Sequence, residues 1–144
     1  MTKYENILVA VDGSKGAQRA FAKALDMAVN QKARLTIVHV VDATVFLPVE
    51  QYKDIITAGS EEYGRELLDR CEKKAKEFGV ENVRTALEFG SPKGQIPGVV
   101  ATKYEADLIV VGATGLNALE RFLLGSVSEA VIRYAPCDVL IARE

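Results

Sequence analysis

Apolar residues gather in short runs that are typical of β-strands. Four of these runs are continuous, as expected for strands that are buried on both faces of a parallel sheet. A fifth run alternates apolar and polar positions, which also suits a strand. Together they predict strands at residues 4–11, 35–41, 82–89, 107–111 and 137–142.

Apolar positions at helical spacing lie between the predicted strands. Residues 17–29 carry a narrow, alanine-rich face, and Ser14 is a candidate N-cap for this helix. Residues 63–78 have a second apolar face, with Ser60 as candidate N-cap and Gly79 as C-cap. The pattern therefore predicts two helices in the first half of the chain.

Prolines and serines mark the two helices of the second half. Pro92 begins a helix, but Pro97 would remove one of its hydrogen bonds, so this helix is either kinked or begins near Pro97. Ser126 or Ser128 is expected to cap the last helix, and Pro136 to end it. By contrast, residues 42–59 show no clear period and are predicted to form a long connection.

Strands and helices alternate along the whole chain. Such alternation predicts an α/β fold, in which helices cover both faces of a parallel sheet through right-handed crossovers. We expect an open, Rossmann-like sheet of five strands in the order 3-2-1-4-5, and a single domain over residues 1–144.

The composition is that of an ordinary globular protein of 144 residues, with 49% apolar residues, 26% charged residues and a net charge of -2. We therefore expect neither nucleic acid nor a membrane as partner. The first residues lack the layout of a signal peptide, and Cys71 and Cys137 form no C-x-x-C pair, which favours a cytoplasmic protein.

Two glycine-bearing turns follow the first and fourth strands: Asp12-Gly13-Ser14, and Gly112-Ala113-Thr114-Gly115. In the predicted strand order these turns meet at the point where ligands bind in such sheets. The second turn leads to Gly125-Ser126 before a helix, whose N-terminus suits a phosphate. The alternative is that these glycines serve only tight turns and caps. Neither a P-loop nor a dinucleotide fingerprint is present.

The glycine spacing Gly112-x2-Gly115-x9-Gly125-Ser126 resembles that of nucleotide-binding universal stress proteins. Further stretches resemble the same family, in order and over essentially the whole chain. They are residues 7–14, 39–42, 106–112, 125–128 and 135–141. One position departs from the family, which often has a basic residue or a histidine where this chain has Thr114.

The resemblance implies a site for ATP with a divalent metal, Mg²⁺ or Mn²⁺. Asp12 would contact the ribose, and the backbone near Val40 would meet the adenine. The remaining implied positions would line the ribose and phosphates or hold the phosphates with the metal: Gly112, Gly115, Gly125, Ser126 and Val127.

The function that the resemblance implies is an ATP-binding stress-response module that signals through conformation and dimerisation. A homodimer is expected through the last strand, residues 137–142, which would otherwise leave an apolar edge exposed. The alternatives are a slow ATPase and a nucleotide-free dimeric interaction protein. No catalytic residues are assigned, because His39, the only histidine, fits a packing role in its strand better than a catalytic one, and Asp107 lies at the wrong end of its strand.

Overall fold

The computed structural model describes residues 3–42, 50–114 and 124–143, with residues 50–59 described as backbone only. These residues form a five-stranded sheet in the order β3-β2-β1-β4-β5, with every neighbouring pair parallel. The predicted fold class and strand order are therefore confirmed. The strands are β1 (Asn6–Ala10), β2 (Arg34–Val41), β3 (Val83–Phe89), β4 (Leu108–Gly112) and β5 (Asp138–Ala142).

The centre of the sheet is β1, where Leu8 lies between Thr36 of β2 and Ile109 of β4. The chain leaves β1 towards β2 on one side and later returns to β4 on the other. The strand order therefore reverses between β1 and β4, as the sequence predicted. The edges of the described sheet are β3 and β5.

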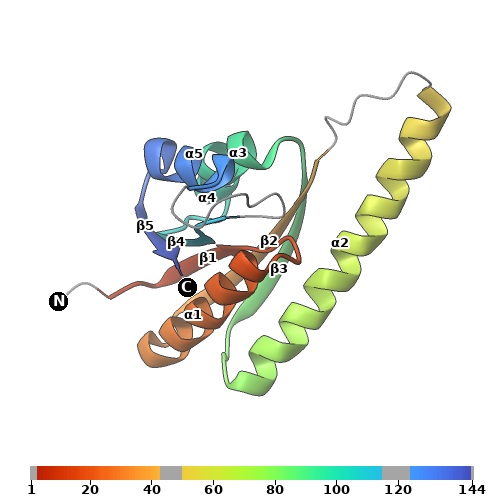
Figure 1. Cartoon of the computed structure of the whole chain (residues 1–144). Helices are drawn as coiled ribbons and strands as arrows, with labels where there is room; N and C mark the ends of the chain where they lie inside the picture. The colour runs from red at the N-terminus through yellow and green to blue at the C-terminus, as the bar shows by residue number, and fades with distance from the viewer. Residues whose placement is uncertain (1–2, 43–49, 115–123, 144) are drawn as a thin grey trace.

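Helices cover both faces of the sheet (Figure 1). Ile7 and Val9 of β1 pack with α1 (Lys15–Gln31) and α2 (Glu50–Phe78) in one core cluster. Leu8 points to the other face and joins a second cluster. That face is covered by a helical segment in three parts and by the last helix: α3 (Pro92–Gly94), η1 (Gln95–Val100), α4 (Ala101–Lys103) and α5 (Ser126–Tyr134).

Two of the predicted caps are confirmed. Ser14 precedes α1, and its hydroxyl oxygen accepts a hydrogen bond from the amide of Ala17 at 3.1 Å. Gly79 follows α2 with φ of 115°, a conformation that glycine adopts without strain, and its amide donates to the carbonyl of Ala75. These contacts fix where α1 begins and where α2 ends.

The predicted start of the second helix is wrong. The helix α2 begins at Glu50, so Ser60 lies inside it rather than at its N-cap, and residues 50–59 are helical instead of part of a long connection. The physical reason is that extending a helix costs far less than starting one, because each added residue gains a hydrogen bond. A helix can therefore continue past a residue that resembles a cap.

Pro97 lies in the π-helical segment η1, between α3 and α4. The amide of Ala101 donates to the carbonyl of Ile96, a hydrogen bond that spans five residues instead of four. Proline has no amide hydrogen, so the wider turn accommodates a position where an α-helix would lose a bond. The helix thus begins at Pro92 and changes its winding at Gln95, so that Pro97 lies within the π-helical segment instead of starting a helix.

Two smaller features complete the fold. The first strand, predicted over residues 4–11, is confined to Asn6–Ala10. No helix in the described ranges combines the length and apolar character that crossing a bilayer requires.

Candidate functional site

The turn after β1 is built around the carboxylate of Asp12. One of its oxygens accepts a hydrogen bond from the amide of Ser14 at 2.9 Å, which closes the turn. Gly13 between them has φ of 84°, in the region that favours glycine. Ser14 is the N-cap of α1, so the helix begins directly after this turn, at the carboxyl end of β1.

The turn after β4 holds the start of α5. The carbonyl oxygen of Ala113 accepts two hydrogen bonds, from the amide of Gly125 at 2.7 Å and from the hydroxyl of Ser128 at 2.9 Å. The amide of Ala113 itself donates to Ala142 at the end of β5. The N-terminus of α5 is therefore fixed against the carboxyl end of the sheet, although nine residues lie between Gly115 and Gly125 in the sequence.

The cap predicted for the last helix is corrected by this geometry. Gly125 is the N-cap of α5, and as a glycine it makes no side-chain hydrogen bond to the helix. Ser126 is the first helical residue, and Ser128 donates its hydroxyl to the carbonyls of Ala113 and Gly125 instead of accepting from an amide. The first amides of a helix have no intrahelical partner, and for this reason a helix N-terminus suits an anion.

The beginning of α1 packs directly on the turn after β4. A Cβ atom added at Gly112 would lie 2.5 Å from the carbonyl carbon and oxygen of Gly16. A Cβ atom at Gly16 would in turn collide with the carbonyl oxygen of Thr114. The two glycines thus allow two backbones to touch, which brings the start of α1 beside the turn that holds α5.

Val40 lies near the carboxyl end of β2, where its side chain is buried in the second core cluster. Its neighbour His39 points to the other face of the sheet and lies with Nδ1 2.8 Å from the carbonyl oxygen of Val11. The ring of His39 is buried and packs against Tyr63 of α2. These contacts favour the predicted packing role of His39 over a catalytic one.

The structure therefore brings together, at the carboxyl end of the sheet, most of the positions expected to bind nucleotide. Asp12 and Val40 follow or end β1 and β2, Gly112 ends β4, and Gly125–Val127 begin α5. The remaining expected position, Gly115, lies outside the described residues.

Metal ligands are not concentrated in the described ranges, which contain no group of three or more His, Cys, Asp or Glu side chains arranged to hold an ion.

Asp107, which was expected to be structural, accepts hydrogen bonds from the amides of Glu5 and Asn6 at 2.8 and 3.0 Å. It thereby fixes the start of β1, at the end of the sheet away from the candidate site.

A polar cluster on β3 was not predicted. One carboxylate oxygen of Glu88 accepts from Lys103 and from the hydroxyl of Tyr104, both at 2.8 Å. The hydrogen bond from Lys103 is the main reason why the pKa of Glu88 is lowered. Arg84 donates to the carbonyl of Tyr104 and stacks over its ring. The residues are up to twenty positions apart in the sequence, so no local pattern predicts that they meet. Their contacts hold α4 against β3 at the edge of the sheet.

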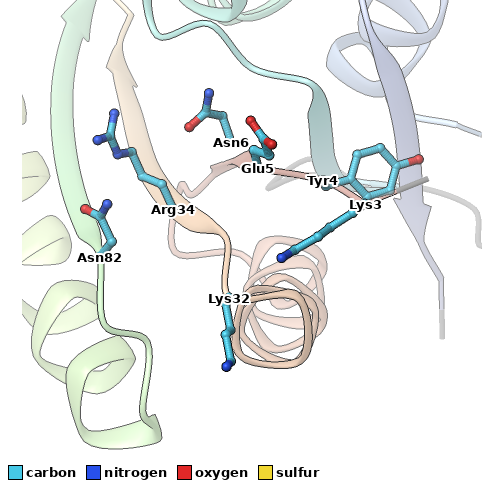
Figure 2. A pocket seen from close by; sticks show the side chains of 7 residues that line it. All are labelled: Lys3, Tyr4, Glu5, Asn6, Lys32, Arg34 and Asn82. Carbon is cyan, nitrogen blue, oxygen red and sulfur yellow. The ribbon is translucent and has the colours of Figure 1, made fainter. Parts of the chain in front are cut away.

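An open pocket of about 450 Å³ lies at the opposite, amino end of the sheet (Figure 2). Three basic side chains, Lys3, Lys32 and Arg34, line it, but Figure 2 shows that their charged ends point in different directions. They do not converge on one point as a phosphate site requires. The other lining residues are Tyr4, Glu5, Asn6 and Asn82.

Comparison with known proteins identifies the class of the protein. A model of the universal stress protein family matches residues 3–143. A putative universal stress protein of Staphylococcus haemolyticus is 50% identical over 143 residues, which are 99% of this chain and 87% of the relative. The chain belongs to the universal stress protein family.

Solved structures agree with this assignment. The universal stress protein UspA from Lactobacillus plantarum superposes with a TM-score of 0.91 at 32% identity, covering 99% of this chain and 100% of that one. A universal stress protein in complex with cAMP superposes with a TM-score of 0.70 at 28% identity, covering 98% of each chain. The likeness therefore extends over the whole sheet and its helices.

Proposed function

We propose that this universal stress protein is a cytoplasmic ATP-binding regulatory module. ATP would occupy the carboxyl end of the sheet between β1 and β4, and occupancy would change the conformation presented to partners. The slow ATPase is the lower-ranked alternative, because rapid phosphoryl transfer needs a positioned base and cationic groups, and the described site offers no such set.

The observation that carries the proposal is the pair of helix N-termini at the switch point of the sheet. Ala113 ties the start of α5 to the end of β4, and Gly112 lies against Gly16 at the start of α1. Among the described residues no side chain caps the amino end of α5, so its first amides could donate to a phosphate. A nucleotide would place negative charge where these helices carry partial positive charge.

The described residues also suit the sugar and the base. Asp12 uses one carboxylate oxygen to close its own turn, and its carboxylate can also accept hydrogen bonds from ribose hydroxyls. The backbone near Val40 would meet the adenine, because Val40 lies near the carboxyl end of β2, the strand that pairs with β1. Gly125, Ser126 and Val127 would hold phosphates. Because no acidic cluster is described at the site, Mg²⁺ or Mn²⁺ would be held chiefly by those phosphates.

The first experiment is to denature protein purified without added nucleotide and to identify what it releases by chromatography. ATP recovered near one per chain supports the binding module, and ADP shifts the balance towards hydrolysis. Titration calorimetry with ATP and Mg²⁺ then compares wild type with Gly115→Val, which should lose binding, and with Gly94→Ala, where an added Cβ meets nothing within 4 Å. A wild-type protein that neither carries nor binds ATP contradicts the proposal and favours the nucleotide-free interaction protein.

A second candidate ligand is cAMP, since a universal stress protein similar to this chain over its whole length is known in complex with it. Both ligands share adenine and ribose, and they differ in the phosphates that the N-terminus of α5 would hold. Calorimetry with cAMP beside ATP separates the two. If cAMP binds more tightly than ATP in the presence of Mg²⁺, the module is a cAMP-binding protein instead.

A further inference from the structure

The side chain of Tyr63, on α2, lies over the turn that follows β1. Its hydroxyl is 3.5 Å from the carbonyl oxygen of Asp12. A Cβ atom added at Gly13 would collide with the same hydroxyl, so the tyrosine rests directly on the glycine. With 45% of its surface exposed, Tyr63 also faces solvent. An aromatic side chain from a different helix therefore borders the turn that carries Asp12.

Close packing on β2 holds this ring in place. The rings of Tyr63 and His39 meet edge to face, with centroids 6.0 Å apart and an angle of 74° between their planes. A Cβ atom added at the next residue, Gly64, would lie 2.6 Å from Cδ2 of His39, so α2 approaches β2 closely at this point. His39 is anchored in turn by the carbonyl oxygen of Val11. Tyr63 is thus fixed against the ends of both β1 and β2.

We propose that Tyr63 forms a wall of the subsite for the base and ribose of a bound adenine nucleotide. The inference rests on the proposed function and assigns a residue of α2 to that site. The base is expected near Val40 and the ribose near Asp12. Tyr63 contacts His39, which is next to Val40, and the backbone of Asp12. A half-exposed aromatic ring gains most from an adenine that covers its remaining open surface.

Calorimetry with ATP and Mg²⁺ tests the contact. Tyr63→Ala removes the ring and should weaken ATP binding about tenfold, as expected when one aromatic–base contact is lost. Tyr63→Phe keeps the ring and should stay within about twofold of wild type, since a hydroxyl 3.5 Å from its acceptor contributes little. The control is Tyr134→Ala at the end of α5, where the side chain is 66% exposed, and its affinity should equal that of wild type.

Tyrosine fluorescence gives an independent measure of proximity. The chain has five tyrosines and no tryptophan, so its emission comes from tyrosine alone. Addition of ATP should change the emission of wild type and of Tyr134→Phe. The same addition should leave the emission of Tyr63→Phe nearly unchanged although this variant still binds. If Tyr63 had only a structural role, the change in emission on addition of ATP would not depend on this residue.

The outcomes separate the inference from the function on which it rests. Wild-type protein that binds ATP, together with unchanged affinity in Tyr63→Ala or a persisting signal in Tyr63→Phe, overturns the inference and leaves the proposed function intact. Wild-type protein that binds neither ATP nor cAMP overturns both. If Tyr63→Ala does not fold, the fluorescence of Tyr63→Phe still decides.

Discussion

Gly112, at the end of β4, lies against the backbone of Gly16, in the first turn of α1. The gap is so small that a Cβ atom on Gly112 would stand 2.5 Å from the carbonyl carbon and oxygen of Gly16. Gly112 belongs to the glycine spacing of nucleotide-binding family members, yet its neighbour in this structure is a helix. The glycine therefore has a structural task, which is to let α1 approach the switch point of the sheet.

Replacing Gly112 with alanine should destabilise the protein whether or not nucleotide is present. The added methyl group meets backbone atoms that cannot rotate away, and overpacking of this kind costs about 2 kcal/mol. Urea unfolding of Gly112→Ala measures the loss. Gly94→Ala is the control, because its Cβ meets nothing within 4 Å, and this variant should be as stable as wild type or more so. Equal stability of Gly112→Ala and wild type would contradict the close approach of α1.

Two serines that resemble helix caps should respond oppositely to alanine. Ser14 accepts the amide of Ala17, so Ser14→Ala should lower the free energy of unfolding by about 1 kcal/mol. Ser60 lies inside α2, where alanine is the better helix former, so Ser60→Ala should be neutral or slightly stabilising. Chemical denaturation of both variants checks the pair. If Ser60→Ala lowered the free energy of unfolding by about 1 kcal/mol, Ser60 would be a helix cap after all.

Acid should weaken the cluster around Glu88. The hydrogen bond from Lys103, together with that from Tyr104, lowers the pKa of Glu88 below its ordinary value of 4.5. A carboxylate with a lowered folded-state pKa stabilises the protein above its ordinary pKa, and the contribution is lost as the pH falls through the folded value. Glu88→Gln should therefore be less stable than wild type at pH 7, by about 1 kcal/mol, with the difference shrinking below pH 4.5.

Urea midpoints measured from pH 7 down to pH 3 follow this convergence. Glu72→Gln is the matched control, because Glu72 pairs with Lys76 at 3.3 Å on an exposed helix surface, where ion pairs contribute little. Its midpoint should run parallel to that of wild type over the whole range. A constant difference between Glu88→Gln and wild type would show that the charge of Glu88 is not what matters.

The exposed edge at β5 should pair with a second copy of the chain. Val139, Leu140 and Ile141 are only partly buried, and β5 has a neighbour on one side alone in the described sheet. We expect light scattering to report a dimer for wild type and a shift to monomer for Val139→Lys. Phe78→Lys, at the exposed end of α2, should remain dimeric. If Val139→Lys folds and is still a dimer, the dimer interface does not lie at β5.

The arrangement of strands could be predicted because a short run of apolar residues is enough to indicate each strand. The run at Ile7–Val11 is apolar on both faces, which only a covered parallel strand tolerates. The turn at Asp12 and the cap at Ser14 follow from side chains that bond to their own backbone. Such local signals need no knowledge of what lies across the fold.

Contacts between distant elements left no such signal. Ser128 resembles a cap in sequence, but its hydroxyl ties α5 to Ala113 after β4. Tyr63 fits an apolar helix face, and only the path of α2 brings it to the turn at Gly13. For Pro97 the sequence offered a kink or a new helix start, and the structure uses a π-helical turn. The site was thus predictable as a place in the sheet, while its supporting contacts were not.

The length of α2 has a mechanical consequence. Figure 1 shows that the half of the helix nearest Glu50 extends beyond the strands, while the other half packs on the sheet. From Tyr63 to Glu50 a helix rises by about 20 Å, so a tilt of about 10° at Tyr63 moves the tip by about 3 Å. Since Tyr63 rests on Gly13, a displacement of that turn that tilted α2 at Tyr63 would be several times larger at the far end of the helix.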